Sequence, residues 1–223
     1  MWQLAFPSLK LAMGWNCVRR RCNVVAMKSA AAAAVFLALL ATPTCAQDVQ
    51  YFPNLALGDT QQAHDFVAGW YTTELKALGE PSMLQLSKAR AHAYRFLWLR
   101  TRHNPVAIRL VVSEHGKSLL TVKVTNGRGG FGGPGLLIKN ETRELSKEET
   151  EWFLDQVEKE QYWSLPTRDD SQSGCDGAAW VIEAAKDGSY KVVDRWSPQK
   201  GPVRALGLAM LRRLAHLNPS PEY

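Results

Sequence analysis

Residues 174–198 read GCDGAAWVIEAAKDGSYKVVDRWSP, and this stretch decides the fold. Two runs rich in β-branched and aromatic residues flank an Asp-Gly pair, which is the pattern of a β-hairpin. A glycine-containing turn precedes the first run and a proline follows the second, so both strands have clear ends. No other part of the chain gathers so many specific residue types in so few positions.

Two registers are open for this hairpin. In a strict two-residue loop Lys186 pairs with Ser189, and apolar residues then share a face with Lys191 and Arg195. In a three-residue loop with its glycine in the left-handed conformation, Ala185 pairs with Ser189. We expect the second register, because a one-residue slip exchanges the two faces and this register separates apolar from charged residues. Its apolar face carries Trp180, Ile182, Ala184, Tyr190, Val192 and Trp196.

The rest of the chain predicts an α+β fold. Alternating apolar residues predict strands over residues 89–101, 106–113 and 120–125, and the apolar run at 136–138 predicts another. Helical spacing predicts helices over about 61–78 and 146–159 and one that starts at Pro202. We therefore expect a single antiparallel sheet of about six strands, with roughly three helices on one or both faces.

The first of these helices has a wide aromatic stripe. Phe66 and Tyr71 both belong to it, and core packing is the expected role of both side chains.

The first 46 residues have the pattern of a signal peptide. Lys28 precedes an 11-residue apolar run at 30–40, and small residues end at Ala46, where we expect cleavage. We expect Met27 to be the true start, which would leave residues 1–26 untranslated. A twin-arginine signal and a lipid anchor on Cys45 are the rival interpretations. Residues 47–223 are then a single domain, periplasmic or secreted, without a transmembrane segment.

Charge and cysteine content exclude some classes of function. Five of the 27 Lys and Arg residues precede Gln47 and no acidic residue does, so residues 47–223 carry 22 basic and 21 acidic side chains. A chain so close to neutral has no net field to attract nucleic acid, and we expect none as a partner. Only Cys175 of the four cysteines lies beyond residue 46, so this part has no internal disulfide.

The sequence holds no recognisable catalytic motif. The five histidines are scattered, and neither G-x-S-x-G nor H-E-x-x-H occurs, so we expect no metal and no cofactor. Asp176 and Glu183 are weak candidates for the two carboxylates of a glycoside hydrolase. The alternative for Asp176 is a turn residue that caps the backbone of its Asp-Gly pair.

A glycine-rich segment, NGRGGFGGPG at residues 126–135, formally fits G-x-G-x-x-G. A dinucleotide site needs a helix after the glycines, whereas an apolar strand-like run follows here, so a hairpin loop is the favoured interpretation. Arg128 and Phe131 are its substantial side chains, and they are candidates for contact with a ligand.

Arg95 is unusual because it lies in a strand that is expected to be buried on both faces. A buried guanidinium needs a carboxylate or several carbonyl groups, and Glu183 is the first candidate for a structural ion pair. The functional alternative is an arginine that binds an anion. The candidate binding residues are Arg95, Arg128, Phe131, Trp180, Arg195 and Trp196.

Several segments resemble an uncharacterised family of exported proteobacterial proteins. They are YRFLWLRTRHNPVAIRL at 94–110, GRGGFGGPG at 127–135, YWSLP at 162–166, DGAAWVIE at 176–183 and YKVVDRWSP at 190–198. The resemblance covers most of residues 47–223. It implies export and assigns no activity.

Two classes of function follow from these features. The first, which we favour, is a non-catalytic envelope module that binds a protein, a glycan or a lipid. The second is a hydrolase with an unfamiliar carboxylate site, and a purely structural domain is the remaining alternative. A cleft where Asp176, Glu183 and Arg195 converge would favour the hydrolase. A flat, apolar-rimmed surface near the glycine loop would favour binding.

Overall fold

The computed structural model describes residues 49–113, 117–130, 132–169, 174 and 176–218. The chain divides into two units, Met1–Cys45 and Ala46–Tyr223, and every described residue lies in the second. The predicted cleavage site, Cys175 and Phe131 fall outside the described residues.

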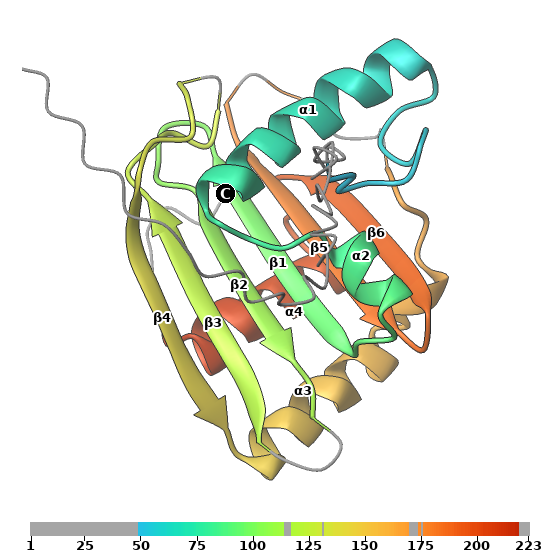
Figure 1. Cartoon of the computed structure of the whole chain (residues 1–223), viewed down its shortest axis with the longest axis vertical. Helices are drawn as coiled ribbons and strands as arrows, with labels where there is room; N and C mark the ends of the chain where they lie inside the picture. The colour runs from blue at the N-terminus through green and yellow to red at the C-terminus, as the bar shows by residue number, and fades with distance from the viewer. Residues whose placement is uncertain (1–48, 114–116, 131, 170–173, 175, 219–223) are drawn as a thin grey trace, which may run out of the picture. The chain divides into compact units, whose positions relative to one another are not determined.

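One antiparallel sheet of six strands forms the centre of the second unit (Figure 1). The strands are β1 (Ala93–Arg100), β2 (Val106–Val111), β3 (Ser118–Thr125), β4 (Leu137–Leu145), β5 (Ala178–Lys186) and β6 (Ser189–Trp196). Their order is β4-β3-β2-β1-β5-β6, and every neighbouring pair is antiparallel. The predicted α+β class is confirmed, and the meander and the hairpin share one sheet.

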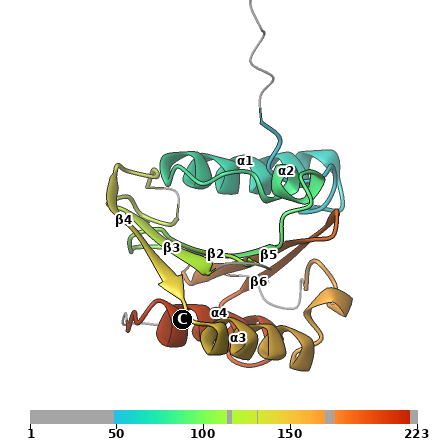
Figure 2. The ribbon, with the colours of Figure 1, turned by 60° about the horizontal axis from the view of Figure 1, so that its bottom comes forward.

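Helices cover both faces of the sheet, which makes three layers (Figure 2). On one face lie α1 (Gln61–Ala77) and α2 (Met83–Lys88). On the other lie α3 (Lys147–Lys159) and α4 (Pro202–Leu208), and α4 continues into a π-helical segment, Ala209–Leu214. A 3-10 turn, Tyr162–Ser164, connects α3 to the segment before β5.

Strand β1 is buried along its whole length, because it lies between β2 and β5 and between two helical layers. Tyr94, Phe96 and Trp98 point to the α3–α4 side, where the larger apolar core forms. Leu97 and Leu99 point to the α1 side and join a second core. The alternation predicted from the sequence is therefore confirmed for this strand.

The expected register of the β5–β6 hairpin is wrong. Lys186 pairs with Ser189, and the loop has two residues, Asp187 and Gly188, with φ values of 53° and 85°. Both residues are left-handed, as a type I′ turn requires. Trp196 therefore lies on the face opposite Trp180.

The physical reason lies in the surroundings of the two strands. Both faces of β5 are buried, so separating apolar from charged residues gives no guide to its register. Lys191 and Arg195 tolerate the α3–α4 face because β6 is an edge strand and both side chains stay partly exposed. On the α1 face, Asp194 accepts a hydrogen bond from the Tyr71 hydroxyl at 3.0 Å.

Helix α1 begins after Thr60, whose side chain accepts a hydrogen bond from the amide of Ala63. Its predicted apolar stripe is only partly correct. Tyr71 is buried against the sheet, but Phe66 is 61% exposed. At about 100° per residue, Phe66 lies about 140° around the helix from Tyr71. Glu74 lies only about 60° around the helix from Tyr71 and is buried with it.

Candidate functional site

Arg95 and Glu183 face each other across β1 and β5 and form a buried ion pair. Arg95 donates from Nε and Nη2 to Oε2 of Glu183, and the Nε to Oε2 distance is 2.9 Å. Its Nη1 donates to the carbonyl of Pro81 at 2.6 Å. The other oxygen of Glu183, Oε1, accepts from the hydroxyl of Tyr190 at 2.9 Å. Both charged groups are therefore satisfied inside the protein.

A second carboxylate, Glu80, extends this ion pair into a network beneath α1 and α2. Its Oε2 lies 3.6 Å from Nη1 of Arg95 and 2.9 Å from Nε of Arg109. Its Oε1 lies 3.1 Å from Nζ of Lys123, which also donates to the carbonyl of Gly79 just past the end of α1. The negative end of the α1 dipole stabilises a cation at this place.

The surroundings of Arg95 and Tyr190 determine the protonation of these two side chains. Burial alone would lower the pKa of Arg95, but the charges of Glu183 and Glu80 outweigh burial and raise it. Burial, followed by the charge of Glu183, raises the pKa of Tyr190 well above its usual range. Arg95 thus stays charged and Tyr190 stays a hydrogen-bond donor. The geometry is that of the structural ion pair expected from the sequence.

The structure does not bring Asp176 and Glu183 together. Glu183 is buried in the middle of β5, whereas Asp176 is exposed before that strand begins. The five residue steps from Ala178 to Glu183 alone span about 16 Å in an extended strand. The paired carboxyl groups of glycoside hydrolases lie within about 5–9.5 Å of each other. Asp176 instead lies 3.7 Å from Nη2 of Arg102, and both side chains are largely exposed.

Most of the other predicted site residues lie at one end of the sheet. This end holds the C-terminal ends of β1, β3 and β6 and the N-terminal ends of β2, β4 and β5, as the antiparallel pairings require. Arg128 lies in the glycine loop, residues 126–135, which joins β3 to β4. Figure 1 shows this loop beyond the strand ends at the upper left. A strand follows the loop, so the hairpin interpretation is confirmed and the dinucleotide interpretation fails.

The glycine loop packs closely on the end of β1. The amide of Gly129 donates to the carbonyl of His103 at 2.9 Å, and the amide of Gly130 donates to Thr101 at 3.3 Å. A Cβ atom at Gly129 would lie 2.6 Å from the amide nitrogen of Arg100, which is closer than real Cβ contacts come. Only glycine permits this approach of two backbones.

Three consecutive aliphatic residues follow the glycine loop and are exposed. Leu136 is 75%, Leu137 41% and Ile138 58% exposed. The amide of Leu136 donates to Oδ1 of Asn126 at 2.8 Å, so the run starts at the base of the loop. Arg102 and Arg128, both exposed, lie at the same end of the sheet. We call these five residues, Arg102, Arg128, Leu136, Leu137 and Ile138, the glycine-loop face.

Arg195 and Trp196 lie at the far side of the same sheet end and line a groove of about 420 Å³. Arg195 donates from Nη1 to the carbonyls of Thr167 and Asp194, at 3.0 and 2.6 Å, and from Nη2 to that of Pro166. It therefore braces the loop before β5. The groove also contains Asp169, Gln199 and Lys200 in its wall.

Trp180 is a core residue. It is fully buried, its ring lies 5.2 Å from that of Phe96 and 5.5 Å from that of Trp98, and Gly207 of α4 packs directly on it. Trp180 and Trp196 therefore lie on opposite faces of the sheet, whereas the register expected from the sequence puts both on the same face.

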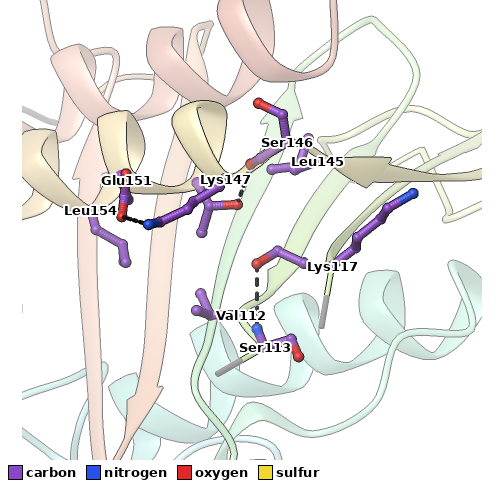
Figure 3. Close-up of a pocket in the computed structure, with 10 residues that line it drawn as sticks. Val112, Ser113, Lys117, Leu145, Ser146, Lys147, Glu151 and Leu154 are labelled. Carbon is purple, nitrogen blue, oxygen red and sulfur yellow. Dashed lines mark hydrogen bonds and ion pairs between the residues drawn. The ribbon is translucent and has the colours of Figure 1, made fainter. Parts of the chain in front are cut away.

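A pocket of about 650 Å³ lies at the opposite end of the sheet, between the β2–β3 connection and the start of α3 (Figure 3). Its polar groups already have partners inside the protein. The hydroxyl of Thr150 donates to the carbonyl of Ser146, and the Oγ of Ser118 accepts from the amide of Ser113. Lys147 pairs with Glu151 at 3.6 Å. A capping box occupies the helix N-terminus, so this pocket presents few unused groups to a ligand.

Two further observations concern cofactors and membranes. Within the described ranges, no group of three His, Cys, Asp or Glu side chains is placed to hold a metal ion. No helix in the described part of the chain has both the length and the apolar character needed to cross a membrane.

Comparison of the chain with known protein families, with curated proteins and with solved structures finds no match.

Sequence reasoning missed two parts of the glycine-loop face. It treated residues 136–138 only as the start of a strand, and it gave no role to Arg102. The available signal was the position of an aliphatic run between a glycine-rich loop and the charged sequence KNETRE at 139–144. Alternating charges are typical of a sheet edge, and an edge strand leaves its flanking residues open to solvent.

Proposed function

We propose that this protein is an exported envelope protein and a non-catalytic binding module, and that the glycine-loop face is its binding surface. The leader pattern at residues 1–46 supports export. The single observation that carries the binding role is the exposed run from Leu136 to Ile138 at the sheet end that also holds Arg102 and Arg128.

In a protein that binds nothing, an exposed aliphatic run of this kind contributes no free energy of burial. Three adjacent aliphatic side chains in water forgo the free energy of burial, about 1.5–3 kcal/mol for each one fully buried. Contiguous apolar surface rimmed by charged residues is a common mark of an interaction site. Arginine is enriched at protein interaction surfaces, and the rim of such a surface is polar.

The catalytic alternative lacks the geometry that it needs. Glu183 is fully engaged by Arg95 and Tyr190, and Asp176 lies at the exposed start of β5. Arg195 donates to backbone carbonyls and does not join either carboxylate. No observation on the described residues favours a hydrolase over a binding module.

Site-specific photocrosslinking in intact cells tests the proposed function. A benzophenone amino acid replaces Leu136 in one variant and Gln62, an exposed residue of α1, in the matched control. We expect a discrete crosslinked product in the envelope fraction from position 136 and none from position 62. Equal crosslinking from both positions, or none from either, would contradict the binding role of this face.

A further inference from the structure

We propose that the partner of the glycine-loop face is an anionic lipid surface, on which the protein docks peripherally. This inference rests on the proposed function and names the chemistry of the partner. The observation that carries it is that an exposed aliphatic run, Leu136 to Ile138, and two exposed arginines, Arg102 and Arg128, lie at the same end of the sheet.

The aliphatic part fits the acyl boundary of a membrane. Leu136 and Ile138 are the most exposed of the three residues and have the greatest area left to bury. The pairing of β3 with β4 shifts register between Val124 and Thr125, at the place where this run joins the sheet. Such an irregularity bends an edge strand and turns side chains away from the regular pleat. The run therefore lies at the corner of the sheet, where the regular pairing of β3 and β4 is interrupted.

The charged part fits lipid phosphate groups. In the part of the chain that the structure describes, Arg128 has no ion pair, and Arg102 has only the loose contact with Asp176. Glu141, the nearest carboxylate along β4, is already paired with Lys139 at 3.0 Å. Arg100 is buried against Trp98 at 4.1 Å and does not belong to this exposed set. A guanidinium group binds phosphate oxygens in a bidentate manner, which suits a headgroup layer.

Backbone hydrogen bonds connect the described residues of the glycine loop to one another. The amide of Arg128 donates to the carbonyl of Gly133 at 3.1 Å, and the amide of Asn126 donates to that of Leu136 at 2.9 Å. Gly129 fixes the same loop to the end of β1. A surface that is already ordered loses little conformational entropy when it binds.

A neutral overall charge does not oppose this role. Residues 47–223 have 22 basic and 21 acidic side chains, so attraction to a membrane depends on local placement. At physiological salt a surface charge acts over about 8 Å, which limits the effect to the groups nearest the membrane. Aliphatic side chains and guanidinium groups at one sheet end match the acyl boundary and the phosphate layer of an anionic membrane surface.

Vesicle sedimentation tests the inference. The unmodified protein and all variants are purified from the same host without further processing, so that any leader that remains uncleaved is present in every sample. Vesicles of phosphatidylcholine alone are compared with vesicles that also contain phosphatidylglycerol. We expect binding to the anionic vesicles that weakens as salt is added. Each of R102S and R128S should weaken binding about fivefold. The double variant L136S/I138S should weaken it by about tenfold or more.

Matched controls come from exposed residues elsewhere on the molecule. R212S and F66S remove one cation and one apolar group at sites away from the glycine-loop face, and we expect both to bind like the unmodified protein. Equal binding to both kinds of vesicle, or losses in the controls as large as those in R128S, would overturn the inference. If the crosslink from position 136 is to a protein while vesicles are not bound, the lipid partner is wrong and the binding role stands.

Discussion

Arg95 and Glu183 are directly opposed in the β1–β5 pairing, and two nitrogens of the guanidinium group donate to a single carboxylate oxygen. That arrangement leaves the second oxygen for Tyr190. Neither charged side chain has measurable exposure. The pair therefore links the central strand to the hairpin by a contact that solvent does not screen.

Removing one partner of this pair should strongly destabilise the fold. R95L leaves Glu183 buried without its cation, and E183Q leaves Arg95 with only the more distant Glu80. We expect either change to lower the free energy of unfolding by about 3–5 kcal/mol, because one charge is stranded. Urea denaturation of the purified variants measures this loss.

The exposed pair of Arg102 and Asp176 supplies the matched control. D176N breaks an ion pair in which both side chains are more than two-thirds exposed, and we expect a change within about 0.5 kcal/mol. An E183Q variant as stable as the unmodified protein would refute the structural role of the buried pair.

Glu74 should make stability depend on pH. One of its oxygens, Oε2, has no hydrogen-bond partner among the described residues, and burial raises the pKa of this carboxyl to about 7 from its ordinary value of 4.5. The folded state therefore holds this proton more tightly than the unfolded chain does. The contribution of Glu74 to stability is fully present below about pH 4.5 and is lost as the pH rises through about 7.

The variant E74Q removes this dependence, because glutamine stays neutral. We expect its melting temperature to exceed that of the unmodified protein by a few degrees at pH 8, with a smaller difference at pH 5. E151Q, at an exposed position of α3, should show no such trend. A difference between E74Q and the unmodified protein that is constant from pH 5 to pH 8 would contradict the assignment.

The close approach of the glycine loop to β1 gives a steric prediction. G129A places a methyl group 2.6 Å from the amide nitrogen of Arg100 and 2.7 Å from the Cα of Leu99, so the loop must move. We expect a loss of about 1–3 kcal/mol in the free energy of unfolding. In contrast, G69A meets nothing within 4 Å on the outside of α1 and should stabilise the protein by about 0.5–1 kcal/mol. Equal stability of the two variants would refute the packing.

The sequence predicted correctly those parts of the fold in which a local residue pattern is compatible with only one arrangement of buried and exposed faces. Strand β1 alternates because its two faces meet different cores, and an arginine among its apolar residues implied a carboxylate across the sheet. The register of the hairpin failed because both faces of β5 are buried. An apolar residue on such a strand is equally well placed in either register.

The candidate site was harder to predict, because it depends on which surfaces the helices leave open. Leu136 and Ile138 look like core residues in sequence, but they are exposed because no helix in the described part of the chain covers the start of β4. Asp176 and Glu183 are close in sequence but belong to an exposed turn and a buried strand. In an extended strand even a few residues separate two side chains by more than about 10 Å. The residue types alone do not show that the segment is extended, so the sequence did not reveal this separation.

The sheet order also sets the sequence in which the protein can fold. Residues Arg95 and Glu183 are 88 positions apart, whereas the β1–β4 meander is built from neighbouring segments. Closing that long loop costs entropy before any contact compensates for it, so we expect the meander to form first. Until β5 arrives, one edge of β1 stays unpaired beside Phe96 and Trp98, and such an edge readily pairs with another chain. The last hairpin to be synthesised is thus the one that protects the first strand of the sheet from aggregation.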